Sequence, residues 1–269
     1  MRIDAHVHVS TEPGYADRLV AEMDRLGFDR TLLNGFVTYG DQSGNDAVAA
    51  ALARHPKRII GAAYLDLATQ SAADVRTFHE RAFRALKLIG PPANYDDKRF
   101  YPVYDAAAEL GMVCLFHTGI VSRSPAPIDR VHDVNNDRMR PIYLDTIARQ
   151  IPELNIIGAH FGNPWYDEAA MAARWNPNLY WDLSGSTLKK RTAQDLAKLL
   201  WWTETSRYRD PEGRPAWQKI VFGSDVPIEE IEEVVRDYEA VLGALGIRED
   251  IQAAIFGDTL ARLLMLPTR

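Results

Sequence analysis

Two histidines near the N-terminus, His6 and His8, have the spacing of a metal-binding pair. They alternate with apolar residues in the segment 3–9, and this period of two is typical of a β-strand. Side chains two apart in a strand point the same way, so both imidazoles and Asp4 are expected on one face. Imidazole binds zinc, iron, nickel and copper. The pair therefore predicts a metal site, with two ordinary structural histidines as the alternative.

Four more residues with reactive side chains occur within or at the ends of predicted strands. They are Lys87 in the fourth strand, His117 and His160 at the ends of the fifth and sixth, and Asp225 after the eighth. Each has an ordinary explanation, such as a hydrogen-bonded core histidine, a helix cap at Asp225 or a solvent-exposed tip for Lys87. Their shared position favours one metal-binding cluster, which Asp4 is expected to support through hydrogen bonds.

Apolar periodicity divides the chain into strands that alternate with helices. The predicted strands are 3–9, 31–36, 58–65, 85–89, 112–116, 155–160, 179–183 and 219–224. This alternation predicts a parallel sheet with crossover helices, and eight units in 269 residues predict a single (β/α)8 TIM barrel over residues 1–269. Functional residues of such barrels lie at the carboxyl ends of the strands, so one mouth is expected to collect the cluster.

Composition narrows the class of protein further. A net charge of −6 argues against a nucleic-acid partner, which favours a basic face. The single cysteine, Cys114, excludes an internal disulfide and fits a reducing compartment. We find neither a signal peptide nor a run of about 18 apolar residues. We therefore expect a cytoplasmic protein without a membrane partner, acting on a small-molecule substrate.

The combination of His6-x-His8, His117, His160 and Asp225 resembles the amidohydrolase superfamily of metal-dependent barrels. The segments 154–165 and 182–185 are similar to the branch that also holds the aminocarboxymuconate-semialdehyde and resorcylate decarboxylases. The resemblance implies that His6, His8, His117 and Asp225 hold one divalent metal. Zinc is the preferred ion, with manganese or iron as alternatives.

The resemblance also implies roles in catalysis. A metal-bound water, acidified towards a pKa of about 7, would be the nucleophile. Asp225 would take its proton, and His160 would act as an acid, base or electrophile. In some members of the superfamily a carbamylated lysine on strand four bridges two metals, and Lys87 matches that position. We prefer one metal, with Lys87 as a substrate-binding or supporting residue.

The loops are expected to set specificity. Arginines 123, 130, 138 and 140 follow the fifth strand, mostly as exposed ion pairs. We predict that Arg138 binds a substrate carboxylate through two hydrogen bonds and that Trp165 forms a wall of the pocket. Tryptophans 201, 202 and 217 could instead pack loops or form a subunit interface, so a homodimer is a further expectation.

We expect a metal-dependent hydrolase in which the metal-bound water attacks an ester, lactone or amide carbon of a small, carboxylated substrate. The alternative is a non-oxidative decarboxylase of an aromatic or enoic acid, and these residues do not separate the two. A nuclease or phosphoesterase is disfavoured by the acidic charge, and a barrel without activity by the complete ligand set.

Overall fold

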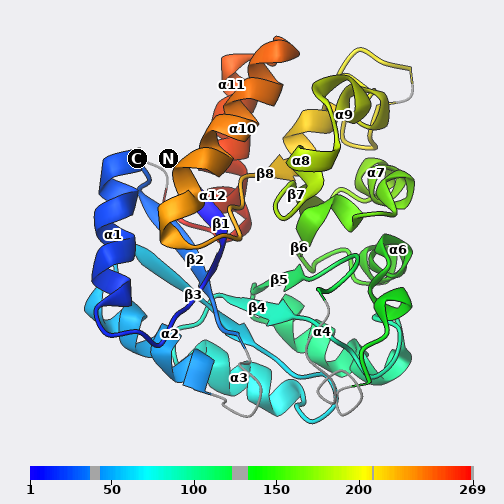
Figure 1. Cartoon of the computed structure of the whole chain (residues 1–269). Helices are drawn as coiled ribbons and strands as arrows, with labels where there is room; N and C mark the ends of the chain where they lie inside the picture. Colours follow the sequence, from blue (N-terminus) through cyan, green and yellow to red (C-terminus); the bar gives the residue numbers. More distant parts are fainter. Residues whose placement is uncertain (37–42, 123–132, 208, 268–269) are drawn as a thin grey trace.

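The computed structural model describes residues 1–36, 43–122, 133–207 and 209–267. Eight parallel strands form one sheet in chain order, with helices around it (Figure 1). The strands are β1 (Ile3–His8), β2 (Arg30–Asn34), β3 (Ile59–Tyr64), β4 (Ala85–Leu88), β5 (Val113–Phe116), β6 (Ile156–Gly158), β7 (Leu179–Asp182) and β8 (Ile220–Val221). The predicted (β/α)8 barrel is confirmed.

The helices lie outside the strands that they connect, as the crossover rule requires. They are α1 (Tyr15–Leu26), α2 (Ser43–Arg54), α3 (Ala72–Glu80), α4 (Tyr101–Glu109), α6 (Pro141–Gln150), α7 (Tyr166–Trp175), α8 (Thr187–Lys190), α9 (Ala193–Leu199), α10 (Ile231–Ala244), α11 (Glu249–Ala253) and α12 (Thr259–Leu263). Among the described residues no helix is long and apolar enough to cross a membrane.

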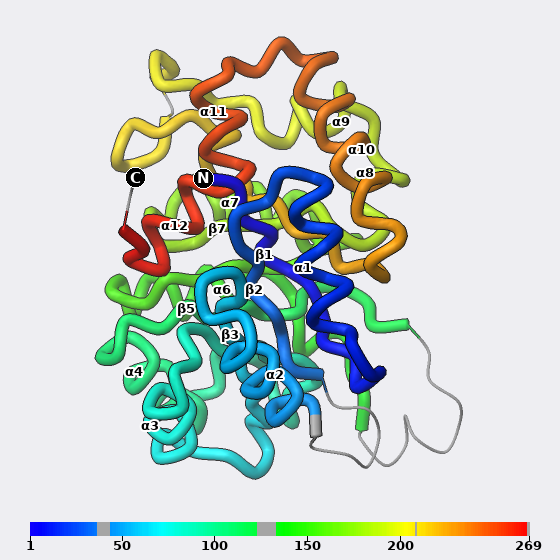
Figure 2. Tube along the Cα trace, turned by 90° about the vertical axis from the view of Figure 1, so that its left-hand side faces the viewer, coloured from blue at the N-terminus to red at the C-terminus, as the bar shows by residue number. Residues whose placement is uncertain are grey.

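Two backbone hydrogen bonds join β1 to the segment that follows β8. The N–H of Ala5 donates to the carbonyl of Phe222 at 2.9 Å, and the N–H of Asp225 donates to the carbonyl of His6 at 2.7 Å. Figure 2 shows the N-terminal segment beside the C-terminal helix α12. This seam places the segment after β8 beside β1, so that Asp225 comes close to His6 and His8.

The alternation of side chains along β1 changes phase at its middle. Pairing with β2 is irregular between Asp4 and Val7. Ala5 packs with the barrel interior, whereas Val7 packs with the layer between the strands and the helices. Because an irregularity of this kind redirects the side chains that follow it, His6 and His8 face the barrel mouth.

Asp4 does not share the face of the two histidines, so that prediction was wrong. It lines a small gap in the outer layer together with Val7 and Leu19. A strict period of two cannot show the irregularity in β1, and this is the reason for the error. Asp4 nevertheless supports the site, because its Oδ1 accepts the backbone N–H groups of His6 and Ser224, each at 3.0 Å. Burial raises the pKa of Asp4 to about 6.

The tryptophans after β7 differ in exposure. Trp202 and Trp217 are buried and pack loops onto the barrel, whereas Trp201 is 45% exposed. A homodimer stays a prediction.

Candidate metal centre

Three side chains converge at the carboxyl ends of β1 and β8. His6 Nε2 lies 3.2 Å from His8 Nε2, and Asp225 Oδ1 lies 3.2 Å from His8 Nε2 and 3.5 Å from His6 Nε2. Ligands bound tetrahedrally at about 2.0–2.2 Å from a zinc ion are separated by roughly 3.3–3.6 Å. The spacing and the chemistry of these three donors therefore fit a divalent cation.

Asp225 reaches the cluster from the turn that follows β8. Its backbone has a positive φ of 52°, which is uncommon outside glycine. Burial alone would raise the pKa of its carboxyl, but His6, His8 and His160 hold that pKa well below the usual value. The carboxylate is therefore ionised, as a metal ligand must be.

His6 is oriented by Asp182, a residue at the end of β7 that the sequence analysis left without a role. Asp182 Oδ2 lies 2.9 Å from His6 Nδ1, and both side chains are fully buried. Burial alone would raise the pKa of Asp182. Interactions with His6, His160 and Ser184 outweigh that effect and lower the pKa to about 2. Its position offered a signal in the sequence, because Asp182 ends the seventh strand much as Asp225 follows the eighth.

His160 and His117 lie beside each other, next to the cluster. His160 Nε2 is 3.2 Å from His117 Nδ1 and 3.7 Å from Asp225 Oδ2. Burial lowers the pKa of both histidines. His117 Nε2 is buried without a hydrogen-bond partner among the described residues, which suits a metal ligand. A fourth ligand at His117 stays a prediction, because this imidazole stands outside the three-residue cluster.

The sixth strand is shorter than predicted. β6 ends at Gly158, and His160 occupies a 3-10 turn with a φ of 62°. The turn still brings His160 to the mouth of the barrel. Strand prediction to residue 160 was therefore wrong in secondary structure, although the predicted location of His160 is confirmed.

Lys87 extends from β4 into the floor of the mouth. Its Nζ lies 2.6 Å from His6 Nε2. Burial lowers the pKa of Lys87 to about 8, against the opposing effect of Asp225 and Asp182. Within the described part of the chain Lys87 forms no ion pair with a carboxylate. A cation bound at His6 Nε2 would take the same lone pair and release the Lys87 amine towards the cavity.

The two predicted substrate-binding residues lie away from the cluster. Arg138 pairs with Asp133 at 2.8 Å and also donates to the carbonyl of Pro91. The ring of Trp165 lies 5.5 Å from the guanidinium of Arg140. Neither lines the cavity at the mouth, so their roles stay predictions. Arg123 and Arg130 lie outside the described residues.

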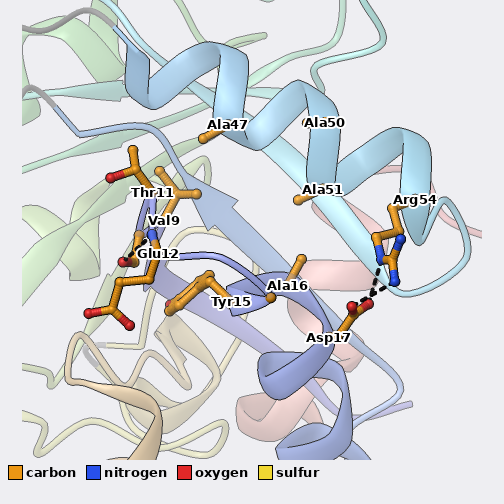
Figure 3. Close-up of a pocket in the computed structure, with 12 residues that line it drawn as sticks. Val9, Thr11, Glu12, Tyr15, Ala16, Asp17, Ala47, Ala50, Ala51 and Arg54 are labelled. Atoms are coloured by element: carbon orange, nitrogen blue, oxygen red, sulfur yellow. Dashed lines mark hydrogen bonds and ion pairs between the residues drawn. The ribbon is translucent and has the colours of Figure 1, made fainter.

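The cavity at the mouth is lined by two residues of the cluster, His8 and Asp225, and by their neighbours. Its walls include His8, Phe36, Tyr64, Lys87, Ile89, His117, His160, Asp225 and Ile228. A smaller cavity of about 360 Å³ lies between α1 and α2, with Ala16 and Ala51 in its wall and the exposed Asp17–Arg54 ion pair at one end (Figure 3). Of these two cavities in the described part of the chain, the one at the mouth is lined by predicted metal ligands.

The fold has several structural relatives. A TIM-barrel protein from Bordetella bronchiseptica shares 18% identity over 98% of each chain, with a TM-score of 0.72. A probable 2-pyrone-4,6-dicarboxylic acid hydrolase from Acinetobacter baumannii, with citric acid bound, shares 15% identity over 98% of this chain and 99% of that one, with a TM-score of 0.67. A 5-carboxyvanillate decarboxylase from Novosphingobium aromaticivorans, complexed with manganese, shares 14% identity over 99% of this chain and 96% of that one, with a TM-score of 0.66.

Sequence comparison gives two further findings. No curated protein matches the chain. The amidohydrolase family model matches residues 3–266, nearly the whole chain. The resemblance stated from His6, His8, His117, His160 and Asp225 is thereby confirmed at the level of the family. The chain belongs to the amidohydrolase family.

Proposed function

We propose that this chain is a metal-dependent hydrolase of a small, carboxylated ester, lactone or amide. The observation that carries the proposal is the triangle of His6 Nε2, His8 Nε2 and Asp225 Oδ1, with sides of 3.2 to 3.5 Å. These residues would hold one divalent ion, for which we propose zinc, with His117 as the expected fourth ligand. When bound, such an ion acidifies water and polarises a carbonyl group.

The two oxygens of Asp225 face different neighbours. Oδ1 faces His6 and His8, whereas Oδ2 lies 3.7 Å from His160 Nε2. We assign Oδ1 to ligation and Oδ2 to proton transfer. In hydrolysis, water attacks the carbonyl carbon and gives its proton to Asp225, which passes a proton to the departing oxygen or nitrogen as its bond to carbon breaks.

Lys87 supports a carboxylated substrate. Its ammonium group is buried in the floor of the cavity, and it loses its partner when His6 Nε2 binds a cation. A substrate carboxylate would restore a charge-assisted hydrogen bond there. The named substrates of the hydrolase and decarboxylase relatives both carry carboxylates. We propose Lys87 as a substrate-binding residue beside one metal, rather than as a carbamylated bridge between two.

Decarboxylation of an aromatic acid is the second candidate. Phe36 and Tyr64 line the cavity, and aromatic walls suit a planar ring. The manganese-containing relative is a decarboxylase, which supports the same chemistry here. The bond from the ring to the carboxylate would break, carbon dioxide would leave, and the ring carbon would take a proton from solvent, relayed by Asp225.

Product analysis distinguishes the two reactions. The protein, loaded in turn with zinc, manganese or iron, is offered lactones and amides in one panel and hydroxybenzoates in another, in ¹⁸O-labelled water. We expect a product carrying ¹⁸O, activity that chelation abolishes, and recovery with about one metal per chain. Carbon dioxide without ¹⁸O in the organic product would establish the lyase instead. Full activity in a metal-free protein would contradict both.

Replacement of Lys87 by methionine is expected to weaken substrate binding. The loss of one charge-assisted hydrogen bond costs about 1.5–3 kcal/mol, so KM for a carboxylated substrate should rise by roughly 10- to 150-fold. Metal content should be unchanged. Steady-state kinetics and metal analysis measure the two effects.

Lys219 offers a matched control. It is also fully buried, but it precedes β8 at the other end of the barrel, where it donates to the carbonyls of Asn176 and Pro177. In the fraction of the Lys219→Met variant that folds, KM should equal that of the parent protein. Equal values of KM for Lys87→Met and the parent would exclude substrate binding by Lys87.

A further inference from the structure

A series of hydrogen bonds from Asp182 through Ser184 to His160 connects the end of β7 to the turn after β6. Asp182 Oδ1 accepts the backbone N–H of His160 at 2.8 Å and that of Ser184 at 3.0 Å. The Ser184 hydroxyl lies 2.5 Å from the same oxygen and 2.9 Å from His160 Nδ1. Asp182 and Ser184 are almost fully buried and His160 is 9% exposed, so these side chains take their partners from the protein.

The hydroxyl of Ser184 has one proton, and its direction can be assigned. Asp182 Oδ1 already accepts two backbone N–H groups, so it is an acceptor and the Ser184 hydroxyl donates to it. The oxygen of Ser184 then accepts from His160, and His160 Nδ1 must carry a proton. By the same reasoning His6 Nδ1 donates to Asp182 Oδ2, which leaves a lone pair on His6 Nε2. An ammonium at Lys87 Nζ donates to that lone pair.

We infer that Asp182 is a positioning residue that fixes the Nδ1–H tautomer of His6 directly and of His160 through Ser184. The lone pair of each imidazole is thereby placed on Nε2, which at His6 faces His8 and Asp225 and at His160 lies in the wall of the cavity, before any ligand arrives. The same reasoning assigns the proton of His117. Its Nδ1 lies 3.2 Å from the unprotonated His160 Nε2 and therefore donates to it. Its buried Nε2, which has no partner among the described residues, then presents a lone pair as well.

His8 differs from the other three histidines. Its Nε2 faces Asp225 Oδ1, an acceptor, and the unprotonated His6 Nε2, both at 3.2 Å. His8 Nε2 therefore carries the proton in the metal-free protein. Ligation through this atom requires the proton to leave Nε2. His8 is thus expected to change its tautomer on metal binding, whereas His6 retains its own.

The sequence of the loop fits this role. In Asp182-Leu183-Ser184-Gly185, the acid and the hydroxyl are two residues apart, and the glycine that follows lies against the His160 ring. A Cβ at Gly185 would stand 2.9 Å from His160 Nδ1, and the φ there is +64°. Any larger residue would crowd the nitrogen that Ser184 contacts.

The experiment is a long-range ¹H–¹⁵N spectrum of the metal-free protein labelled with ¹⁵N-histidine, at neutral pH. His6→Gln, His8→Gln and His160→Gln variants assign the signals. We expect a protonated Nδ1 and an unprotonated Nε2 at His6 and His160, and the reverse at His8. Adding zinc should change the tautomer of His8 and leave that of His6. A protonated Nε2 at His6 or His160 in the metal-free protein would overturn the inference.

Two variants distinguish the direct effect of Asp182 on His6 from its effect on His160 through Ser184. Ser184→Ala should remove the Nδ1–H preference of His160 and keep that of His6, whereas Asp182→Asn should disturb both. Asp182→Asn should also lower zinc affinity by about 10- to 100-fold, as loss of a ligand's hydrogen-bond partner typically does. Unchanged His160 signals in Ser184→Ala would contradict the relay.

Thr187→Val is the structural control. The Thr187 hydroxyl donates to the carbonyl of His160 at 2.8 Å and does not touch its ring. This variant should perturb the same turn yet leave both tautomers intact. The same loss of the His160 tautomer in Thr187→Val and Ser184→Ala would indicate general disruption and reject the relay. These spectra need no substrate, so failure of the proposed hydrolase function would not alter them.

Discussion

His6→Ala is expected to abolish metal binding and activity together. The variant removes the imidazole that contacts His8, Asp225 and Asp182, so the remaining donors no longer form a triangle. Loss of a partner that only orients a ligand costs about 10- to 100-fold in metal affinity or activity, and loss of a ligand should exceed that range. Metal analysis after dialysis and turnover of the best substrate measure the two losses.

His79→Ala is the matched control for this prediction. His79 lies in the last turn of α3, outside the cavity at the mouth, and its loss should leave metal content unchanged. Full metal occupancy in folded His6→Ala would show that the triangle is not the metal site. His117→Ala answers a separate question, because a large drop in zinc affinity there would establish the fourth ligand.

Trp181→Ala is expected to cause the largest loss of stability. Trp181 is fully buried between the strands and the helices, where its ring meets Phe161 edge to face at a centroid distance of 6.0 Å. Truncation of a buried tryptophan leaves a large cavity and costs about 3–5 kcal/mol. Urea unfolding of the metal-free proteins measures the change in the free energy of unfolding.

Gly158 provides a test of the contact itself. A Cβ at this glycine would stand 2.2 Å from Trp181 Cζ3. Gly158→Ala should therefore destabilise the protein by about 1–3 kcal/mol through overpacking. Combined with Trp181→Phe, which vacates part of that space, the alanine should cost less than it does alone, by roughly 0.5 kcal/mol or more. Strict additivity of the two changes would show that the tryptophan does not limit the size of residue 158.

The barrel could be predicted from sequence because its strands follow simple periodicity. The segments around Leu32, Ile60 and Leu115 are apolar and short, and the helices between them carry their own start and stop signals. Tertiary positions of His117, His160 and Asp225 followed from the rule that carboxyl ends of strands share one mouth. These predictions needed only the order of the elements along the chain.

The finer geometry could not be predicted in the same way. The irregularity in β1 reverses the expected relation between Asp4 and His6, and it depends on pairing with β2 rather than on residue type. The role of Asp182 depends on its contact with His6, which is 176 residues away in the sequence. Arg138 was assigned to the substrate because of its charge, but a nearby acid, Asp133, engages it at the rim. Such competition between partners is settled by three-dimensional packing.

The seam between β1 and β8 has a consequence for folding. His6 and His8 belong to the first strand of the sheet, whereas Asp225 and the backbone that pairs with Ala5 follow the last one. The three side chains therefore meet only when these two strands lie side by side. We expect metal affinity to report on closure of the barrel, because a molecule with an open seam would lack the complete triangle.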